Sequence, residues 1–401
     1  MATEFVAGNR LTLLNSGREY FPALLAALDE AKSEIYLESY IFADDEVGSA
    51  VATSLAGAAE RGVRVQVLVD GFGAPAFAVD FLPRLLAAGV HAMLYRPEVA
   101  RFKLRRHRLR RLHRKIVVVD GRIAFVGGIN IVDDNNAPAG LRPRYDYAVR
   151  VEGPILADIL AAVRHMWEIV AWVNLKRRFR VVAPVPARDL PAGTQRAAFL
   201  LRDNIRHRND IANAYLEAIQ GARREILIAN AYFLPGFRFR HAIKAAARRG
   251  VQVTILLQGV SDHPTLRYAT QALYGALIAD GVHVFEYGKS FLHAKVAVVD
   301  GEWATVGSSN IDPFSLLLAK EGNVFIRDRQ FATELRQSLA QAMGEGAHEI
   351  SLDHLARIPF YSRLLRWLSY GLVRLAVGLA GFGPKHWQAD EAKPGSGPEA
   401  S

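Results

Sequence analysis

The sequence predicts an α/β fold made of two similar lobes, each a mixed β-sheet flanked by helices. The first observation is an internal repeat, because four segments of the first half recur in the same order in the second half. The second is that runs of β-branched residues alternate with segments of helical character, which is typical of α/β proteins. The third is the near-continuous apolar run 63–70, which indicates a strand covered on both faces of its sheet.

The repeat consists of four pairs of matching segments, which are 34–42 with 225–233, 61–71 with 249–259, 88–91 with 280–283, and 112–121 with 292–301. Because the order is the same in both halves, the repeat indicates a duplication. Each half should therefore fold in the same way.

Within the first half, the pattern predicts helices at 20–31 and 48–61, the second ending at Gly62. Farther along, an Asp-Gly pair joins two apolar runs in each half, which is a strong signal for a β-hairpin. The predicted hairpins join 116–119 to 123–126 and 296–299 to 303–306.

Changes in composition divide the chain into five parts. A proline-rich segment separates the two lobes, and a stretch rich in Gly, Pro, Ser and Glu at the end of the chain is expected to be disordered. The parts are a first lobe (1–180), a connection (181–194), a second lobe (195–345), an amphipathic helical region (346–383) and a tail (384–401).

Composition limits the function. Of the 401 residues, 51% are hydrophobic, which excludes disorder for the bulk of the chain. There is no cysteine, so disulfides, zinc–thiolate sites and thiol nucleophiles are excluded. The 50 Lys and Arg against 40 Asp and Glu give a net charge of +10, which predicts an anionic partner.

The strongest chemical signal is the pattern His-x-Lys-x-x-x-x-Asp, which occurs once in each half. On a strand, residues two apart point to the same face, so each histidine lies beside its lysine. An imidazole beside an ammonium suits a phosphate group. Each aspartate falls at a hairpin turn, where turn chemistry explains it as well as catalysis does. The six candidate catalytic residues are His113, Lys115, Asp120, His293, Lys295 and Asp300.

Two such sets facing each other could carry out a double displacement. One neutral histidine would attack phosphorus to give a phosphohistidine, and the other would donate a proton to the leaving oxygen. The two lysines would neutralise the charge that develops on phosphorus, so we expect no metal and no other cofactor.

Polar residues follow each motif at similar distances. Asn130, Ser308 and Asn310 come after glycines and could donate hydrogen bonds to phosphate oxygens. Asp146 and Glu321 each stand just before an apolar strand and could orient a histidine, as the acid of a catalytic triad does. Sequence leaves open whether each acid serves the histidine of its own half or of the other.

These motifs, together with 145–154 and 305–313, resemble the phospholipase D superfamily and, within it, the bacterial cardiolipin synthases without N-terminal membrane spans. The resemblance covers about residues 9–360. It implies one active site between the lobes and transfer of a phosphatidyl group to phosphatidylglycerol, with phosphatidylglycerol or phosphatidylethanolamine as the donor. The halves differ in one place, since Gly128-Ile129 stands where the second half has Ser308-Ser309.

Two other functions stay open at this point. A phosphodiesterase of the same superfamily, either a phospholipase D-type lipid hydrolase or a nuclease, would use the same motif, because only the incoming nucleophile distinguishes hydrolysis from transfer. A degenerate member acting as a membrane adaptor is the non-enzymatic alternative, and the two intact His/Lys sets argue against it.

Positive charge is concentrated before the first motif, since nine basic residues and no acid lie between Arg101 and Lys115. This run predicts contact with an anionic phospholipid membrane rather than nucleic acid. A second candidate contact is the aromatic, basic helix near 363–374, for which interfacial binding and packing on the core both stay open. We expect a peripheral protein at the cytoplasmic face of the bacterial inner membrane. The candidate membrane-binding residues are Arg105, Arg106, Arg108, Arg110, Arg111, Trp367 and Arg374.

Overall fold

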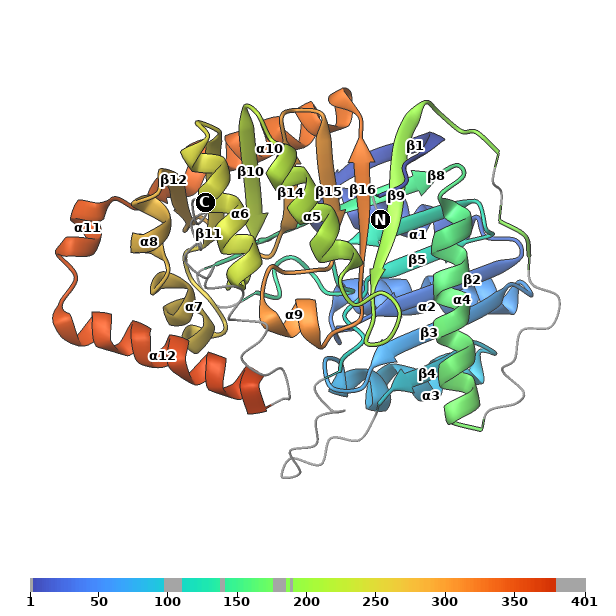
Figure 1. Ribbon diagram of the computed structural model, residues 1–401. Helices are drawn as coiled ribbons and strands as arrows, with labels where there is room; N and C mark the ends of the chain where they lie inside the picture. Colours follow the sequence, from blue (N-terminus) through green and yellow to red (C-terminus); the bar gives the residue numbers. More distant parts are fainter. Residues whose placement is uncertain (1–2, 97–109, 138–140, 176–184, 188–189, 380–401) are drawn as a thin grey trace, which may run out of the picture.

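The computed structural model describes residues 3–96, 110–137, 141–175, 185–187 and 190–379 (Figure 1). Three candidate membrane-binding residues, Arg105, Arg106 and Arg108, lie outside these ranges, as does the tail 384–401.

The described residues of the first half form eight strands and five helical segments. The predicted helices 20–31 and 48–61 are present with small shifts of their ends. The elements are β1 (Val6–Asn15), α1 (Ser16–Asp29), β2 (Glu34–Ser39), α2 (Glu46–Glu60), β3 (Arg64–Asp70), the π-helical turn η1 (Phe77–Phe81), α3 (Leu82–Ala87), β4 (His91–Tyr95), β5 (Ile116–Val119), β6 (Ile123–Gly127), β7 (Arg144–Tyr145), β8 (Tyr147–Glu152) and α4 (Leu156–Val173).

The second half repeats the main strands and helices of this series and then adds a C-terminal region. Its elements are β9 (Gln195–Arg202), α5 (Asp210–Gly221), β10 (Glu225–Asn230), α6 (Phe237–Arg248), β11 (Gln252–Gln258), α7 (Pro264–Gln271), α8 (Tyr274–Ile278), β12 (Val282–Tyr287), β13 (Phe291–Leu292), β14 (Lys295–Val299), β15 (Trp303–Gly307), α9 (Pro313–Leu317), β16 (Glu321–Arg327), α10 (Arg329–Gly346), β17 (Ala347–Glu349), α11 (Leu352–Ala356) and α12 (Phe360–Leu379).

The sheet topology confirms the duplicated α/β fold. From β1 outward the strand order is β1-β8-β6-β5-β2-β3-β4, and from β9 outward it is β9-β16-β15-β14-β10-β11-β12, with β17 at the far edge. The short pairing of β1 with β9 joins the two series into one sheet of fifteen strands. In each half three neighbouring strands run parallel, β2-β3-β4 in the first and β10-β11-β12 in the second. The first strand of the Asp-Gly hairpin, β5 or β14, pairs antiparallel with β2 or β10.

Three apolar cores hold the layers together. One lies under α1, α2 and α3 on the outer face of the first half, and another lies under α5 to α8 on the outer face of the second. The third is shared, since inward residues of β5 and β14, such as Val118 and Val298, pack in one cluster with α4 and α10. Figure 1 shows the two halves side by side, with α4 in front of the first and α10 behind the second.

The Asp-Gly pairs form the turns that the sequence predicts. Asp120 and Gly121 have φ of 53° and 57°, and Asp300 and Gly301 have φ of 53° and 66°. Two successive residues with positive φ are what a two-residue hairpin turn of the favoured twist requires, and Asp-Gly tolerates them best. The turns place the carboxyl end of β5 and of β14 far from the histidines that precede these strands.

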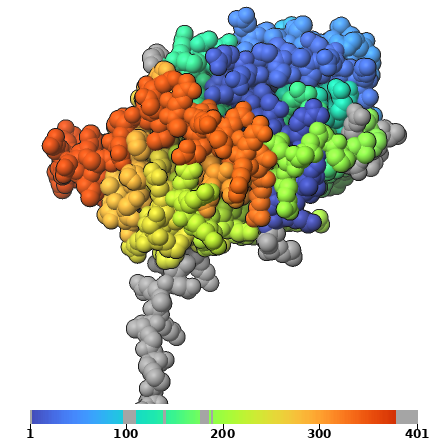
Figure 2. All heavy atoms as spheres, turned by 90° about the horizontal axis from the view of Figure 1, so that it is seen from above, coloured from blue at the N-terminus to red at the C-terminus, as the bar shows by residue number. Residues whose placement is uncertain are grey.

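The C-terminal helix α12 packs through one narrow stripe. Tyr370, Val373 and Val377 are buried against the second-half core, where the helix runs along α7. Its other faces are exposed and strongly apolar, with Trp367 58% and Leu372 58% accessible. Figure 2 shows the orange and red C-terminal segment standing out at one edge of the molecule. In the part of the chain that the structure describes, none of the helices is long and apolar enough to cross a membrane.

Candidate active site

The two motif histidines lie at the same edge of the sheet in both halves. Lys295, two residues after His293, pairs with Asn230 at the carboxyl end of β10, and the first half places its motif in the same way next to β2. In open α/β sheets this edge is where ligands bind, because the loops that leave the parallel strands surround it. The sheet therefore brings both histidines to one end of the molecule.

Each histidine is held by a carboxylate from the other half. His113 Nδ1 lies 3.0 Å from both carboxylate oxygens of Glu321, and His293 Nδ1 lies 2.6 Å from Asp146 Oδ2. The two partners of each pair are 208 and 147 residues apart in the chain. Each acid therefore orients the histidine of the other half, which the sequence alone left open.

Backbone pairing explains the crossing. The amide of His113 donates to the Lys320 carbonyl at 3.0 Å, and the amide of His293 donates to the Tyr145 carbonyl at 2.8 Å. In each case the accepting residue directly precedes the orienting acid. The segment before each motif strand therefore runs alongside the acid-bearing segment of the other lobe, as the parallel pairing of β13 with β7 also shows.

The motif lysines lie on the same face as their histidines and are fully buried. Lys115 Nζ donates to the carbonyl of His113 at 2.7 Å, and Lys295 Nζ lies 3.0 Å from His293 Nδ1. Burial lowers the pKa of Lys115 to about 7 and also lowers that of Lys295. A phosphate between them would restore the charged form, because an anion offsets the cost of burying an ammonium.

Both imidazoles favour the neutral form. Burial lowers the pKa of both imidazoles, and the two motif lysines lower it further in each case. The pKa of His113 falls less than that of His293, because Glu321 acts to raise it. A neutral histidine whose Nδ1–H donates to a carboxylate presents an unprotonated Nε2. That nitrogen is the atom a nucleophilic or basic histidine uses.

The pKa values of the two orienting carboxylates are shifted in opposite directions. Burial raises the pKa of Asp146 to about 6. Burial also acts to raise the pKa of Glu321, but His113, Lys115 and Ser308 together outweigh it and hold the pKa below its usual value. Glu321 thus stays ionised over a wider pH range than Asp146.

Gly128 in the first half and Ser308 in the second each contact the orienting carboxylate of their own half. A side chain at Gly128 would collide with Asp146, whose Oδ1 would lie 2.3 Å from the added Cβ. In the second half Ser308 Oγ instead donates to Glu321 at 2.6 Å and accepts from the Gly322 amide. The predicted phosphate contact of Ser308 is therefore corrected, because its buried hydroxyl is already used to hold Glu321.

The side-chain amides of the two predicted asparagines are held by the backbone. Asn130 Oδ1 accepts from the Ile41 amide at 3.1 Å, and Asn310 Oδ1 accepts from the Tyr232 amide at 3.4 Å. The oxygen ends of both amides are occupied, and the NH₂ of Asn310 also donates to Ser315 Oγ at 3.5 Å. An amide NH₂ has two hydrogens, so both asparagines still have a donor suited to phosphate. Their phosphate-binding role stays a prediction.

The catalytic role predicted for Asp120 and Asp300 is not supported by their position. Asp120 accepts hydrogen bonds from the amides of Lys32, Ser33 and Glu34 at 2.9, 2.7 and 3.0 Å, and so ties its hairpin to the start of β2. Asp300 makes the equivalent contacts with the amides of 223–225. Because both lie at the end of the hairpin strand away from the histidine, they are turn residues.

Aromatic residues that the sequence interpretation did not select complete the site. The Tyr40 ring lies edge-on to His113, with ring centroids 5.0 Å apart, and Lys115 Nζ lies 5.5 Å from the centre of the same ring. Phe291 stacks on His293 at 6.2 Å. Tyr40 belongs to the repeated segment 34–42, but the matching position of the second half is Ala231, so the repeat gave no signal for this residue.

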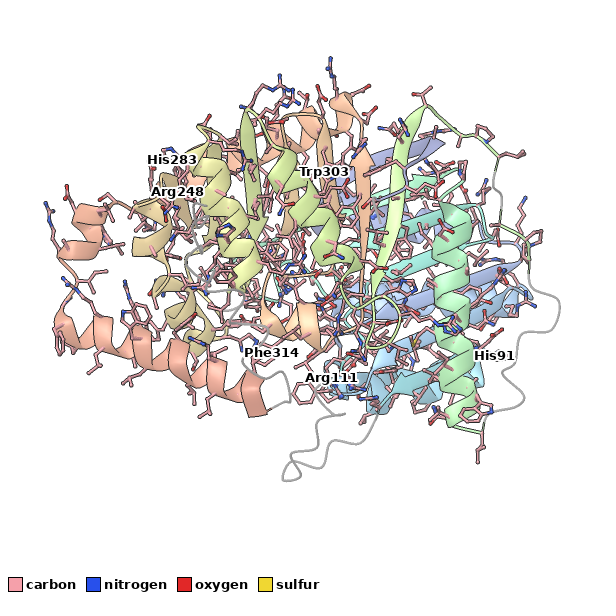
Figure 3. All side chains as sticks on the ribbon, in the orientation of Figure 1. His91, Arg111, Arg248, His283, Trp303 and Phe314 are labelled. Carbon is pink, nitrogen blue, oxygen red and sulfur yellow. The ribbon has the colours of Figure 1, made fainter. Side chains whose placement is uncertain are left out.

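Arg110 and Arg111 differ in their surroundings. Arg110 is exposed. The Arg111 side chain is only 14% exposed, lies 3.4 Å from Asp70 and covers the Phe72 ring. Figure 3 labels Arg111 at the end of the molecule where Phe314 of α9 also lies. An ion-paired and mostly buried guanidinium is not a membrane contact, so that prediction is corrected for Arg111.

Comparison with known proteins identifies relatives of the chain. A family model described as "Cardiolipin synthase, PLD-like domain" matches residues 24–167 and 215–343, one segment in each half. The chain is 41% identical over 379 residues to cardiolipin synthase B of Escherichia coli K12, covering 94% of this chain and 91% of that protein. It is 33% identical over 341 residues to the major cardiolipin synthase ClsA of Bacillus subtilis 168, covering 82% and 68%.

Among solved structures, a phosphatidylserine synthase from Haemophilus influenzae Rd KW20 is similar, with a TM-score of 0.67 at 14% identity, covering 94% of this chain and 96% of that one. A polyphosphate kinase from Porphyromonas gingivalis has a TM-score of 0.56, also at 14% identity, covering 92% of this chain and 53% of that one. At such low identity these two structures show the shared fold alone.

Proposed function

Because the chain belongs to the family of phospholipase D-like cardiolipin synthases, we propose that it makes cardiolipin by transferring a phosphatidyl group from one phospholipid to another. The observation that carries this proposal is the pair of buried histidines, each with Nδ1 held by a carboxylate and each beside a lysine. The proposed donor is phosphatidylglycerol or phosphatidylethanolamine, and the proposed acceptor is phosphatidylglycerol.

The first half-reaction would build a phosphohistidine. Nε2 of one histidine attacks the phosphorus of the donor and forms a P–N bond, while the bond from phosphorus to the headgroup oxygen breaks. The other histidine, in its protonated form, gives its proton to that oxygen, so that glycerol leaves when the donor is phosphatidylglycerol. Lys115 and Lys295 neutralise the oxygens of the phosphorane between them.

The second half-reaction would reverse these roles. The histidine that gave its proton now takes one from the headgroup hydroxyl of phosphatidylglycerol, whose oxygen attacks the phosphorus. The P–N bond breaks and the first histidine returns to its starting form. With phosphatidylglycerol as both substrates, two molecules give one cardiolipin and one glycerol.

The test is incubation of the purified protein with phosphatidylglycerol vesicles in the presence of a chelator, followed by lipid analysis and glycerol determination. Cardiolipin and glycerol in equal amounts are expected. Phosphatidic acid and glycerol without cardiolipin would replace the synthase with a hydrolase. A product that forms only after phosphatidylethanolamine is added would change the donor and leave the acceptor and the histidine chemistry in place.

We also propose that α12 lies in the headgroup region of an anionic membrane, which would make the protein peripheral. Its exposed face carries Trp367, Leu368 and Leu372, and Arg374 lies near the ring of Tyr370. An apolar face with an interfacial tryptophan and bordering cations is the pattern of helices that lie in the plane of a membrane. The anionic cytoplasmic leaflet would attract the basic chain, and we propose that side of the inner membrane.

Replacing Leu368 and Leu372 together by glutamate is expected to lower binding to phosphatidylglycerol vesicles at least about tenfold, because each lost leucine forfeits apolar burial and each new carboxylate is repelled. Co-sedimentation with vesicles measures the effect. Leu190→Glu, which changes an equally exposed leucine on the connection between the lobes, is the matched control and should bind normally. Equal binding of all three proteins would contradict the role of α12.

A further inference from the structure

A cavity of about 820 Å³ lies between the two halves outside the histidine site. Seven cationic side chains and one carboxylate, that of Asp203, line it. Its volume falls within the range of roughly 300–1,000 Å³ that is typical of ligand pockets. None of the motif histidines, motif lysines or orienting acids lines it.

The cavity and the histidine site lie on opposite faces of the same chain segments. Successive residues of an extended segment point to opposite sides. His113 and Glu321 face each other in the site, whereas their neighbours Arg114 and Lys320 line the cavity. The cavity is therefore a separate site whose wall is the backbone that holds His113.

Lys320 is a half-buried cation of the cavity. Arg114 is already paired with Glu38 at 2.9 Å, and Arg202 donates to the carbonyls of Leu317 and Ala319. For the half-buried Lys320 ammonium, by contrast, no ion pair or hydrogen bond to another described residue is found. Burial, with the repulsion of Arg114, lowers the pKa of Lys320 to about 8.

The duplication supplies an internal comparison. The position equivalent to Lys320 in the first half is Tyr145, since each precedes an orienting acid and pairs with the leucine before a motif histidine. Tyr145 is hydrogen-bonded to Tyr147, and Arg114 is replaced by Ala294. The duplicated fold therefore also forms with uncharged residues at these two positions.

Another part of the cavity lining is mainly apolar, with His165 as a polar member. It is formed by the last turns of α4, with Met166, Ile169, Val170 and Val173 along one face. Ile169 is 40% exposed and Val173 is 64% exposed, so this wall opens to the surface. A ligand that fits both walls has an anionic group at one end and a hydrocarbon chain at the other.

We propose that this cavity binds an anionic phospholipid in addition to the lipids that react at the histidines. Its phosphate would lie at Lys320 and Arg206, and an acyl chain would lie along α4. Hydrogen bonds from ammonium and guanidinium groups to phosphate are charge-assisted, and the apolar wall of α4 would take hydrocarbon from water. Bound anion would also offset the repulsion between Lys320 and Arg114. The inference rests on the proposed function only for the choice of lipid.

The experiment uses the full chain with His113→Ala and His293→Ala, so that no lipid is turned over. Because the chain has no cysteine, Ile169→Cys places a single polarity-sensitive dye at the apolar wall. Monomeric dihexanoyl phosphatidylglycerol is expected to shift the dye emission to the blue with saturation, and inorganic phosphate should compete without causing a shift. Lys320→Gln with Arg206→Gln should weaken the lipid affinity at least about tenfold.

The matched control is Lys289→Gln, which removes an exposed lysine from the other large cavity and should leave the affinity unchanged. An equal shift with dihexanoyl phosphatidylcholine, or displacement by a short oligonucleotide at lower concentration than by phosphate, would overturn the inference. So would an unchanged affinity in the Lys320 and Arg206 variant. Absence of lipid binding here, in a protein whose unsubstituted form makes cardiolipin, would overturn this inference alone. Binding without cardiolipin formation would overturn the proposed function alone.

Discussion

Replacing either His113 or His293 by alanine is expected to lower the rate of phosphatidyl transfer at least about 10³-fold, to the limit of detection. One histidine forms the covalent bond to phosphorus and the other moves the proton, so loss of either stops both half-reactions. Because the two act as one unit, the double variant should be no slower than the slower single variant.

The measurement is the initial rate of cardiolipin formation, with the unfolding temperature of each variant as a check on folding. His207 and His283 provide matched controls, because each is also paired with a carboxylate, at 2.7 Å in both cases, and each lies outside the site. His207→Ala and His283→Ala should retain near-normal rates. Figure 3 labels His283 on β12. Substantial turnover by both site variants would refute the two-histidine mechanism.

Glu321→Gln and Asp146→Asn are expected to lower kcat by about 10²–10⁴-fold, because an amide no longer favours the correct tautomer or stabilises the imidazolium. The crossed geometry makes the prediction specific. Glu321→Gln should impair His113 and Asp146→Asn should impair His293, although each acid belongs to the other half of the chain.

A pH profile distinguishes positioning of a histidine from general loss of structure. Since burial raises the pKa of Asp146 to about 6, kcat/KM of the unsubstituted protein should fall below that pH, as the carboxylate takes up a proton. The Asp146→Asn variant cannot titrate at this position and should lose that part of the acid limb. On the basic side, kcat/KM should fall above about 7, where Lys115 loses its charge. An identical acid limb in the variant would contradict the role given to Asp146.

The matched controls for the acids are Asp120→Asn and Asp300→Asn. These aspartates accept three backbone hydrogen bonds each at the hairpin turns. Their loss should cost about 1–3 kcal/mol of stability, since backbone amides lose a charged acceptor, while kcat of the folded protein changes little. A loss of kcat at full stability as large as that of Glu321→Gln would restore the catalytic role to these residues.

The sequence predicted the fold because its signals are local and occur twice. The helices, the buried strands and both Asp-Gly hairpins each depend on a few neighbouring residues, and the repeat supports the strands and the hairpins. The His/Lys pairs were predictable for the same reason, since residues two apart on a strand share a face. The aspartates of the same motif show the limit of this reasoning, because spacing could not tell a catalytic acid from a turn residue.

By itself the sequence determined the duplicated α/β fold, the two histidine–lysine sets and a basic chain suited to an anionic partner. Only the tertiary structure decided that Glu321 serves His113 and Asp146 serves His293, that Ser308 supports a carboxylate, and that Lys320 faces a cavity away from the site. The physical reason is how far apart in the sequence the contacting residues lie. A strand's own residues set which side chains share a face, but which carboxylate meets an imidazole depends on how two lobes pack across 147 or 208 residues of intervening chain.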